Sequence, residues 1–173
     1  MVTQNFNRIE KKYLLTDDQY KKFTEKIKNY MSLDEYGNYK ICNIYFDTPN
    51  YELIRRSIEK PVYKEKLRLR SYGTPDKSTN VFFEIKKKFK GTVYKRRITL
   101  PLNEFYNFFE NGVKPPSIKT QMENQIFNEL KYFTEFYDLK NQTYISYERI
   151  AYHGNENSDF RLTFDHNIKT RLT

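Results

Sequence analysis

The chain has 173 residues, which is enough for one domain with a sizeable hydrophobic core, and its 14 Phe and 16 Tyr argue against disorder. A polar start, the absence of any apolar run of about 18 residues and a single cysteine, Cys42, predict a cytoplasmic protein without a signal peptide or transmembrane segment. The net charge of +9, from 31 Lys and Arg against 22 Asp and Glu, favours a polyanionic partner such as nucleic acid, a phosphate compound or an anionic membrane.

The first expected elements are a strand and a helix. Residues 5–15 alternate in character and predict a strand. Residues 16–31 predict an amphipathic helix, because Thr16 and Gln19 have capping-box spacing and apolar side chains follow at helical intervals. Gly37 then predicts a turn.

A strand, a short helix and a basic strand are expected next. Residues 39–48 predict a largely apolar strand, and residues 50–59 predict a short helix that ends at Pro61. Residues 63–73, "YKEKLRLRSYG", predict a strand in which basic residues alternate with others. Because a strand places alternate side chains on opposite faces, two leucines share one face and four cations share the other. These cations are Lys64, Lys66, Arg68 and Arg70.

The remainder of the chain predicts a hairpin, two helices and another pair of strands. The strands are expected at residues 81–90 and 92–100, around Gly91, and at 142–153 and 159–168, with helices at 102–112 and 119–137. With no internal repeat or linker, the pattern predicts a single α+β domain over residues 1–173, rich in antiparallel strands.

The excess positive charge is concentrated on strand faces. Sorted by alternation, the charged faces of the expected strands hold twelve cations and three anions, which accounts for the whole net charge of +9. The cations are Arg8, Lys12, Lys64, Lys66, Arg68, Arg70, Lys86, Lys88, Lys95, Arg97, Arg149 and Arg161, and the anions are Glu10, Glu84 and Asp165. A basic composition without a function would instead spread the excess over helices and loops.

A sheet with one charged and one apolar face has two simple arrangements. Either water solvates the charged face, or the sheet closes and that face lines a lumen, with helices packed outside on the apolar face. Clustered cations in a lumen repel one another strongly, so a chain of phosphates is a natural occupant. The three acids have two possible roles: they neutralise neighbouring cations, or they hold a divalent metal against phosphate oxygens.

Six short motifs resemble one family. "RIEKKY", "KLRLRSYG", "FFEIKKK", "YKRRI", "ISYERIAY" and "FRLTFD" stand in the order found in the VTC domain, the polyphosphate polymerase domain of the CYTH-like triphosphate tunnel metalloenzymes. The resemblance covers nearly the whole chain. It implies an antiparallel β-barrel forming a tunnel, and transfer of the ATP γ-phosphoryl group to polyphosphate with Mn²⁺ or Mg²⁺.

The resemblance also implies roles for individual residues. The catalytic set is Lys12, Arg68, Arg70, Lys86 and Arg149. Substrate-binding residues are Arg8, Lys66, Lys88, Lys95, Arg97, Tyr147 and Arg161, with Tyr147 beside the nucleotide base; Glu10, Glu84 and Asp165 are the candidate metal ligands. Arginine suits such a site because one guanidinium binds two phosphate oxygens. The partners expected are ATP and polyphosphate, and a membrane partner is not identified.

The chain departs from the family pattern in two places. Arg8 stands where hydrolytic relatives have the first Glu of Glu-x-Glu-x-Lys, which favours a polymerase over a triphosphatase. After Thr173 no strand carrying Glu-x-Lys follows, so the barrel is expected to be incomplete at this end.

Two alternatives to polymerisation stay open: a metal-dependent triphosphatase on the same scaffold, and a non-catalytic module that binds polyphosphate or another polyanion. Single-stranded nucleic acid is not expected. Grooves for it interleave cations with exposed aromatic rings, and the cationic faces here show only Phe82 and Tyr147.

Overall fold

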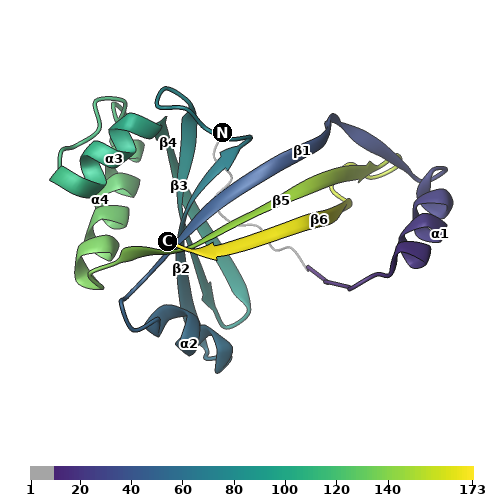
Figure 1. The fold of residues 1–173 in the computed structure, drawn as a ribbon, viewed down its shortest axis with the longest axis horizontal. Helices are drawn as coiled ribbons and strands as arrows, with labels where there is room; N and C mark the ends of the chain where they lie inside the picture. Colours follow the sequence, from purple (N-terminus) through teal and green to yellow (C-terminus); the bar gives the residue numbers. More distant parts are fainter. Residues whose placement is uncertain (1–9) are drawn as a thin grey trace.

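The computed structural model describes residues 10–173 as one six-stranded sheet with four helices (Figure 1). In sheet order the strands are β4 (Thr92–Pro101), β3 (Asn80–Phe89), β2 (Tyr63–Tyr72), β1 (Met31–Asp47), β5 (Lys140–Gly154) and β6 (Arg161–Leu172). Every neighbouring pair is antiparallel. The α+β class and the antiparallel sheet expected from the sequence are therefore confirmed.

The sheet is open over residues 10–173. Strands β4 and β6 form its two edges and do not pair with each other. In Figure 1, β2, β3 and β4 run across the direction of β1, β5 and β6, so the sheet turns strongly from one edge to the other. The expected barrel is thus present as a strongly twisted open sheet, because closure requires backbone hydrogen bonds that join the two edges.

Four helices flank the sheet: α1 (Asp17–Ile27), α2 (Glu52–Ile58), α3 (Leu102–Asn111) and α4 (Gln121–Phe136). The predicted capping box at the start of α1 is present, since the Thr16 hydroxyl accepts from the Gln19 amide and the Gln19 side chain accepts from the Thr16 amide. A second capping box begins α4. No helix in the described part of the chain is both long and apolar enough to cross a membrane.

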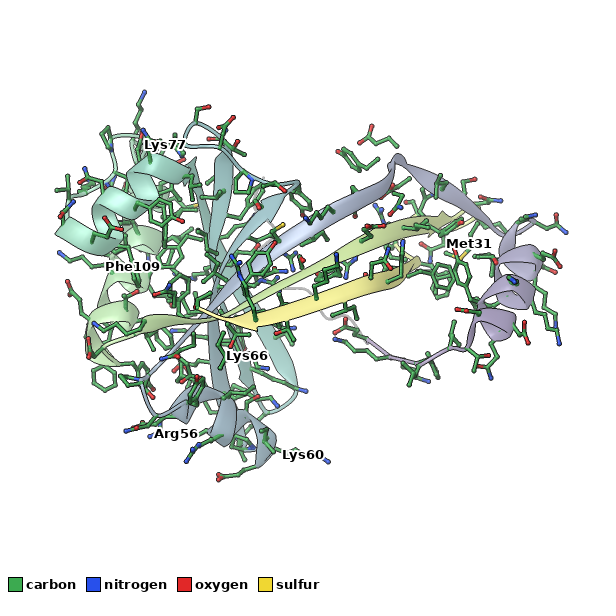
Figure 2. The ribbon with its side chains drawn as sticks, in the orientation of Figure 1. Met31, Arg56, Lys60, Lys66, Lys77 and Phe109 are labelled. Carbon is green, nitrogen blue, oxygen red and sulfur yellow. The ribbon has the colours of Figure 1, made fainter. Side chains whose placement is uncertain are left out.

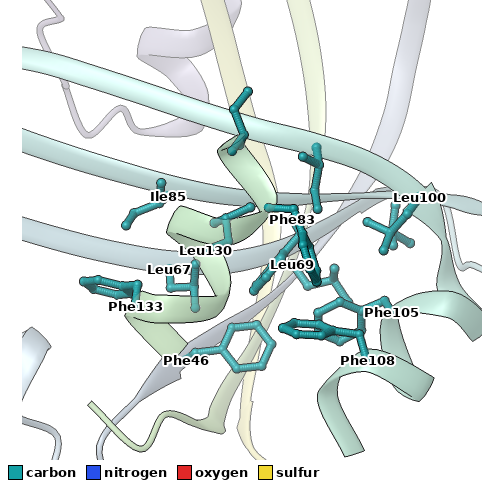
Figure 3. Close-up of a cluster of buried hydrophobic side chains, with 14 of the residues drawn as sticks. Phe46, Leu67, Leu69, Phe83, Ile85, Leu100, Phe105, Phe108, Leu130 and Phe133 are labelled. Atoms are coloured by element: carbon teal, nitrogen blue, oxygen red, sulfur yellow. The ribbon is translucent and has the colours of Figure 1, made fainter. Parts of the chain in front are cut away.

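The hydrophobic core lies between one face of β1–β4 and the helices α3 and α4 (Figure 3). Leu67 and Leu69 point into it and are 0% and 4% exposed. Phe83 is fully buried and packs edge-to-face on Phe105 of α3, with ring centroids 5.1 Å apart. The helices therefore cover the leucine face of β2, and the opposite face of this part of the sheet carries the cations.

Helix α1 lies at the far end of the long strands, away from this core (Figure 1). There Phe164 of β6 packs against Tyr20 and Phe23 of α1, with ring centroids 4.8 Å and 6.1 Å away.

Two local predictions were wrong. The expected strand at 5–15 is not formed by residues 10–15, and its first five residues lie outside the described part. Tyr13 and Leu14 are 77% and 99% exposed there, so alternation alone does not form a strand without a neighbour to pair with. Gly37 is not a turn before the next strand: it has φ +62° inside β1, where the register against β5 shifts between Leu33 and Asn38.

Candidate functional site

Strand register gathers the predicted cations on one face. Lys66 lies opposite Lys86, and Lys86 lies opposite Lys95; in the adjacent row Arg68 lies opposite Glu84, and Glu84 opposite Arg97. Directly opposed residues share a face of a sheet. We call this surface the cationic face; its basic residues are Lys64, Lys66, Arg68, Arg70, Lys86, Lys88, Lys95 and Arg97.

Glu84 is the buried anion at the centre of this face. It is 1% exposed, and its Oε2 accepts a hydrogen bond from Arg68 Nε at 2.7 Å. Lys95 Nζ lies 2.7 Å from Glu84 Oε1, and Arg97 Nη1 lies 3.9 Å from the same oxygen. One carboxylate thus serves three cations, which leaves an excess of positive charge beside it.

Burial and charge oppose each other in this cluster. Burial favours the neutral carboxyl, but Arg68 and Lys95 outweigh it and hold the pKa of Glu84 below its ordinary value. Burial likewise disfavours the Arg68 cation, yet Glu84 and Tyr45 raise its pKa. Burial lowers the pKa of Lys95, and Glu84 only partly compensates. Arg68 and Glu84 are therefore a fixed ion pair, whereas Lys95 is less well neutralised.

A second group of cations on the face has no anionic partner. Lys64, Lys66, Lys86 and Lys88 form no ion pair with a carboxylate within residues 10–173. Figure 2 labels Lys66, which stands on β2. Burial, and then the charges of Lys64, Lys86 and Lys12, lower the pKa of Lys66. Lys12 thus lies near enough to act on this face, although its side chain is 82% exposed. An anion bound here would relieve the repulsion.

Strand β1 supplies two residues that the sequence interpretation missed. Arg70 Nε donates to Asn43 Oδ1 at 3.0 Å, and Arg68 Nη1 donates to Tyr45 Oη at 3.4 Å. Asn43 is 1% exposed and also donates to the Ile145 carbonyl at 3.3 Å, which fixes its orientation. Both residues thus orient guanidinium groups. The sequence could have indicated both residues, because they stand at alternate positions of a largely apolar strand.

A separate ion pair joins β5 and β6. Arg149 donates from Nε and Nη2 to the two carboxylate oxygens of Asp165, at 2.6 Å and 2.8 Å, and its guanidinium lies 5.2 Å from the centroid of the Tyr147 ring. Burial disfavours the charged form of Arg149, but the interaction with Asp165 outweighs burial and raises the pKa of Arg149. Asp165 therefore neutralises a neighbouring cation, which is the first of the two roles considered for the three acids.

One predicted contact lies apart from the cationic face, and another cannot be placed. Arg161 begins β6 opposite His153, four residues and about 13 Å along the strand from Asp165. Arg8 lies outside the described residues. The structure therefore does not bring Arg161 to the other phosphate-binding candidates.

The three predicted metal ligands are not gathered into one site. Glu84 is surrounded by cations, Asp165 is held by Arg149, and Glu10 lies 3.9 Å from Lys12 on an exposed segment. No group of three or more His, Cys, Asp or Glu in residues 10–173 could hold a metal ion. These side chains do not fit a protein-held Mn²⁺ or Mg²⁺, because a divalent cation at Glu84 would face three positive charges.

The view that this face is nearly free of aromatic rings was wrong. Tyr39, Tyr45 and Tyr72 also lie on it, because the register places Tyr45 opposite Arg68 and Tyr72 opposite Ile41 of the same β1 face. Tyr72 follows Arg70 at the next alternate position of β2, so its own strand could have revealed it. Tyr39 and Tyr45 come from β1, where this face carries no cation, so alternation within that strand could not show that they lie beside cations.

The family assignment agrees with the motifs. The family model of the VTC domain matches residues 7–173. The chain belongs to the VTC domain family. A search of curated proteins gave no match to this VTC domain.

Solved structures similar to this VTC domain are distant. Candidate adenylate cyclases from Bacillus halodurans and Vibrio parahaemolyticus are 15% and 12% identical, with TM-scores of 0.49 and 0.45. The similarity covers 89% and 88% of this chain, and 77% and 63% of theirs. A candidate adenylyl cyclase from Hippeastrum, described as having a dominant triphosphatase activity, is 12% identical with a TM-score of 0.44, over 89% of this chain and 76% of that one. These values are too low to transfer any role.

Replacing Lys66 with Met should separate stability from anion binding. The variant keeps most of the apolar stem but removes a charge crowded by other lysines. Without ligand we expect the Tm to rise by about 2 °C, and the Tm increase caused by tripolyphosphate to shrink. The pKa of Lys66 is lower in the folded than in the unfolded chain. The destabilising effect of the Lys66 charge is therefore complete below the folded pKa and fades as pH rises above it. The difference in Tm between Lys66→Met and wild type should fade over the same range.

Thermal unfolding at low salt, with and without tripolyphosphate, measures both effects. Lys22→Met, on the exposed surface of α1, is the matched control and should change neither. An unchanged response of Lys66→Met to tripolyphosphate would contradict a role for Lys66 in anion binding.

Proposed function

We propose that this VTC domain transfers the γ-phosphoryl group of ATP to polyphosphate on the cationic face. The observation that supports this most is the cross-strand register, which places Arg68, Arg70, Lys86 and Lys95 on one face with more positive than negative charge. Proteins that move phosphoryl groups act mainly by aligning oxygens and stabilising negative charge, and such a face can do both.

The proposed step is a displacement at phosphorus. A terminal oxygen of polyphosphate attacks the γ-phosphorus of ATP, a new P–O–P bond forms, and the bond to the β–γ bridging oxygen breaks, releasing ADP. Arg68 and Arg70 bind the reacting phosphates, because Glu84 and Asn43 already hold their guanidinium groups in place. Little reorganisation is then needed when the substrate binds.

Other predicted residues are proposed to act around these two arginines. Lys66, Lys86, Lys88 and Lys95 neutralise the phosphate chain, Lys12 approaches from the N-terminal segment, and Arg149 and Tyr147 bind the nucleotide end. The family resemblance implies Mn²⁺ or Mg²⁺, which would neutralise phosphate oxygens. The described side chains do not assemble a site for it. ATP as substrate and the buried Cys42 fit a cytoplasmic protein.

Incubation with ATP, Mn²⁺ or Mg²⁺ and a short polyphosphate primer tests the proposal. We expect longer polyphosphate and one ADP for each phosphate added, measured by gel electrophoresis and nucleotide chromatography. Release of orthophosphate without chain growth would favour the triphosphatase alternative instead. Binding of polyphosphate with no ADP formed would favour the non-catalytic module.

A further inference from the structure

Four aromatic side chains form a continuous series at one end of the cationic face. Ring centroids lie 6.0 Å apart for Tyr36 and Tyr39, 5.9 Å for Tyr39 and Tyr72, and 5.5 Å for Tyr72 and Phe82. The rings meet edge-to-face, across β1, β2 and β3. We call these four residues the aromatic ledge.

The ledge adjoins the arginines proposed to bind phosphate. Phe82 lies opposite Arg70 across β2 and β3, and Tyr72 stands two residues beyond Arg70, about 7 Å along the strand. The Arg97 guanidinium lies 4.9 Å from the centroid of the Phe82 ring, and Tyr39 lies opposite Arg149. Aromatic surface and phosphate-binding groups therefore follow one another along the face.

The ledge is not a part of the hydrophobic core. Tyr72 is 48% exposed and Tyr36 is 68% exposed, whereas Phe83 and Phe105 on the helix side are 0% and 2% exposed. Exposed rings beside cations suit a ligand that carries a flat aromatic group joined to an anionic chain. A base that stacks on an aromatic side chain binds more tightly, and it needs no specific hydrogen bonds to do so.

We propose that the aromatic ledge binds the base of a nucleoside triphosphate, with Tyr72 and Tyr39 as the contact residues and the phosphates directed toward Arg70 and Arg68. This inference rests on the proposed function, because it takes the phosphate end of the site from it. It assigns the preference for a nucleotide over inorganic polyphosphate to residues of β1 and β2, in addition to Tyr147 on β5.

Paired titrations test the proposal. ATP and tripolyphosphate are titrated separately into the protein at fixed Mg²⁺ and ionic strength, for the wild type, Tyr72→Leu, Tyr39→Leu and Tyr72→Phe. We expect either leucine variant to weaken ATP binding about tenfold and to leave tripolyphosphate binding within twofold. Tyr72→Phe should keep the ATP affinity, since its ring still stacks.

Tyr132→Leu is the matched control. Tyr132 is a 64% exposed tyrosine on α4, stacked on Phe136, and its loss should change neither affinity. Melting curves establish that each variant is folded.

The other outcomes distinguish the base-binding role of the aromatic ledge from the phosphate-binding role of the arginines. If a leucine variant weakens the binding of ATP and tripolyphosphate equally, or of neither, the aromatic ledge does not bind the base. The proposed phosphate-binding role of the arginines is not contradicted by that result. Failure of the wild type to bind tripolyphosphate would refute the proposed function itself. A single-stranded oligonucleotide that binds more tightly than ATP, with the same dependence on Tyr72, would replace the nucleotide by a nucleic acid.

Discussion

Replacing Glu84 with Gln is expected to destabilise the folded protein by about 3 kcal/mol, or about 6–12 °C in Tm. The side chain keeps its shape but loses the charge that serves Arg68, Lys95 and Arg97. Removing one partner of a buried ion pair leaves the other unpaired, which costs more than the intact pair contributes. Chemical or thermal unfolding at neutral pH and low salt measures the loss.

The pH dependence of stability gives an independent check. The pKa of Glu84 is lower in the folded protein than in the unfolded chain, so its stabilising effect is complete above the unfolded value near 4.5 and is lost as pH falls toward the folded value. Glu84→Gln should therefore lie well below the wild type at pH 7 and approach it in acid.

Tripolyphosphate should restore part of the stability of Glu84→Gln, because its negative charge replaces that of the carboxylate. Glu135→Gln, at an exposed ion pair with Lys131 on α4, is the control and should change stability little. If Glu84→Gln is as stable as this control, the carboxylate does not organise the cationic face.

Replacing Arg68 with Met is expected to lower the rate of phosphoryl transfer at least 100-fold, the range found when a preorganised donor to a developing charge is removed. Arg68 is held on the face by hydrogen bonds to both Glu84 and Tyr45. The fold should survive, because Glu84 retains Lys95 at 2.7 Å and Arg97 at 3.9 Å.

Arg68→Lys separates charge from geometry. It keeps the positive charge but cannot bind two oxygens in the plane of a guanidinium, so its activity should fall between wild type and Arg68→Met. Steady-state rates of ADP formation measure these effects, and Arg56→Met on the exposed surface of α2 is the control. Activity of Arg68→Met within threefold of wild type would remove Arg68 from the catalytic set.

Much of the local structure could be predicted because it depends on neighbours in the chain. The period of two along a strand is a property of the backbone, so residues 63–73 alone indicate that Leu67 faces the core and Arg68 the opposite side. The capping box at Thr16 is equally local, and the order of six short motifs was enough to predict the VTC domain family.

Only the tertiary structure decided which strand faces meet. Pairing of β2 with β3 and β4 is non-local, and a slip of one residue would have turned Lys86 away from Lys66. The same register brings Asn43 and Tyr45 to the arginines and Tyr72 to Tyr39, none of which a single strand reveals. The register also decided the role of Glu84. Whether a carboxylate among cations forms ion pairs or binds a metal depends on the distances to its neighbours. For Glu84 these neighbours come from β2 and β4, on either side of its own strand.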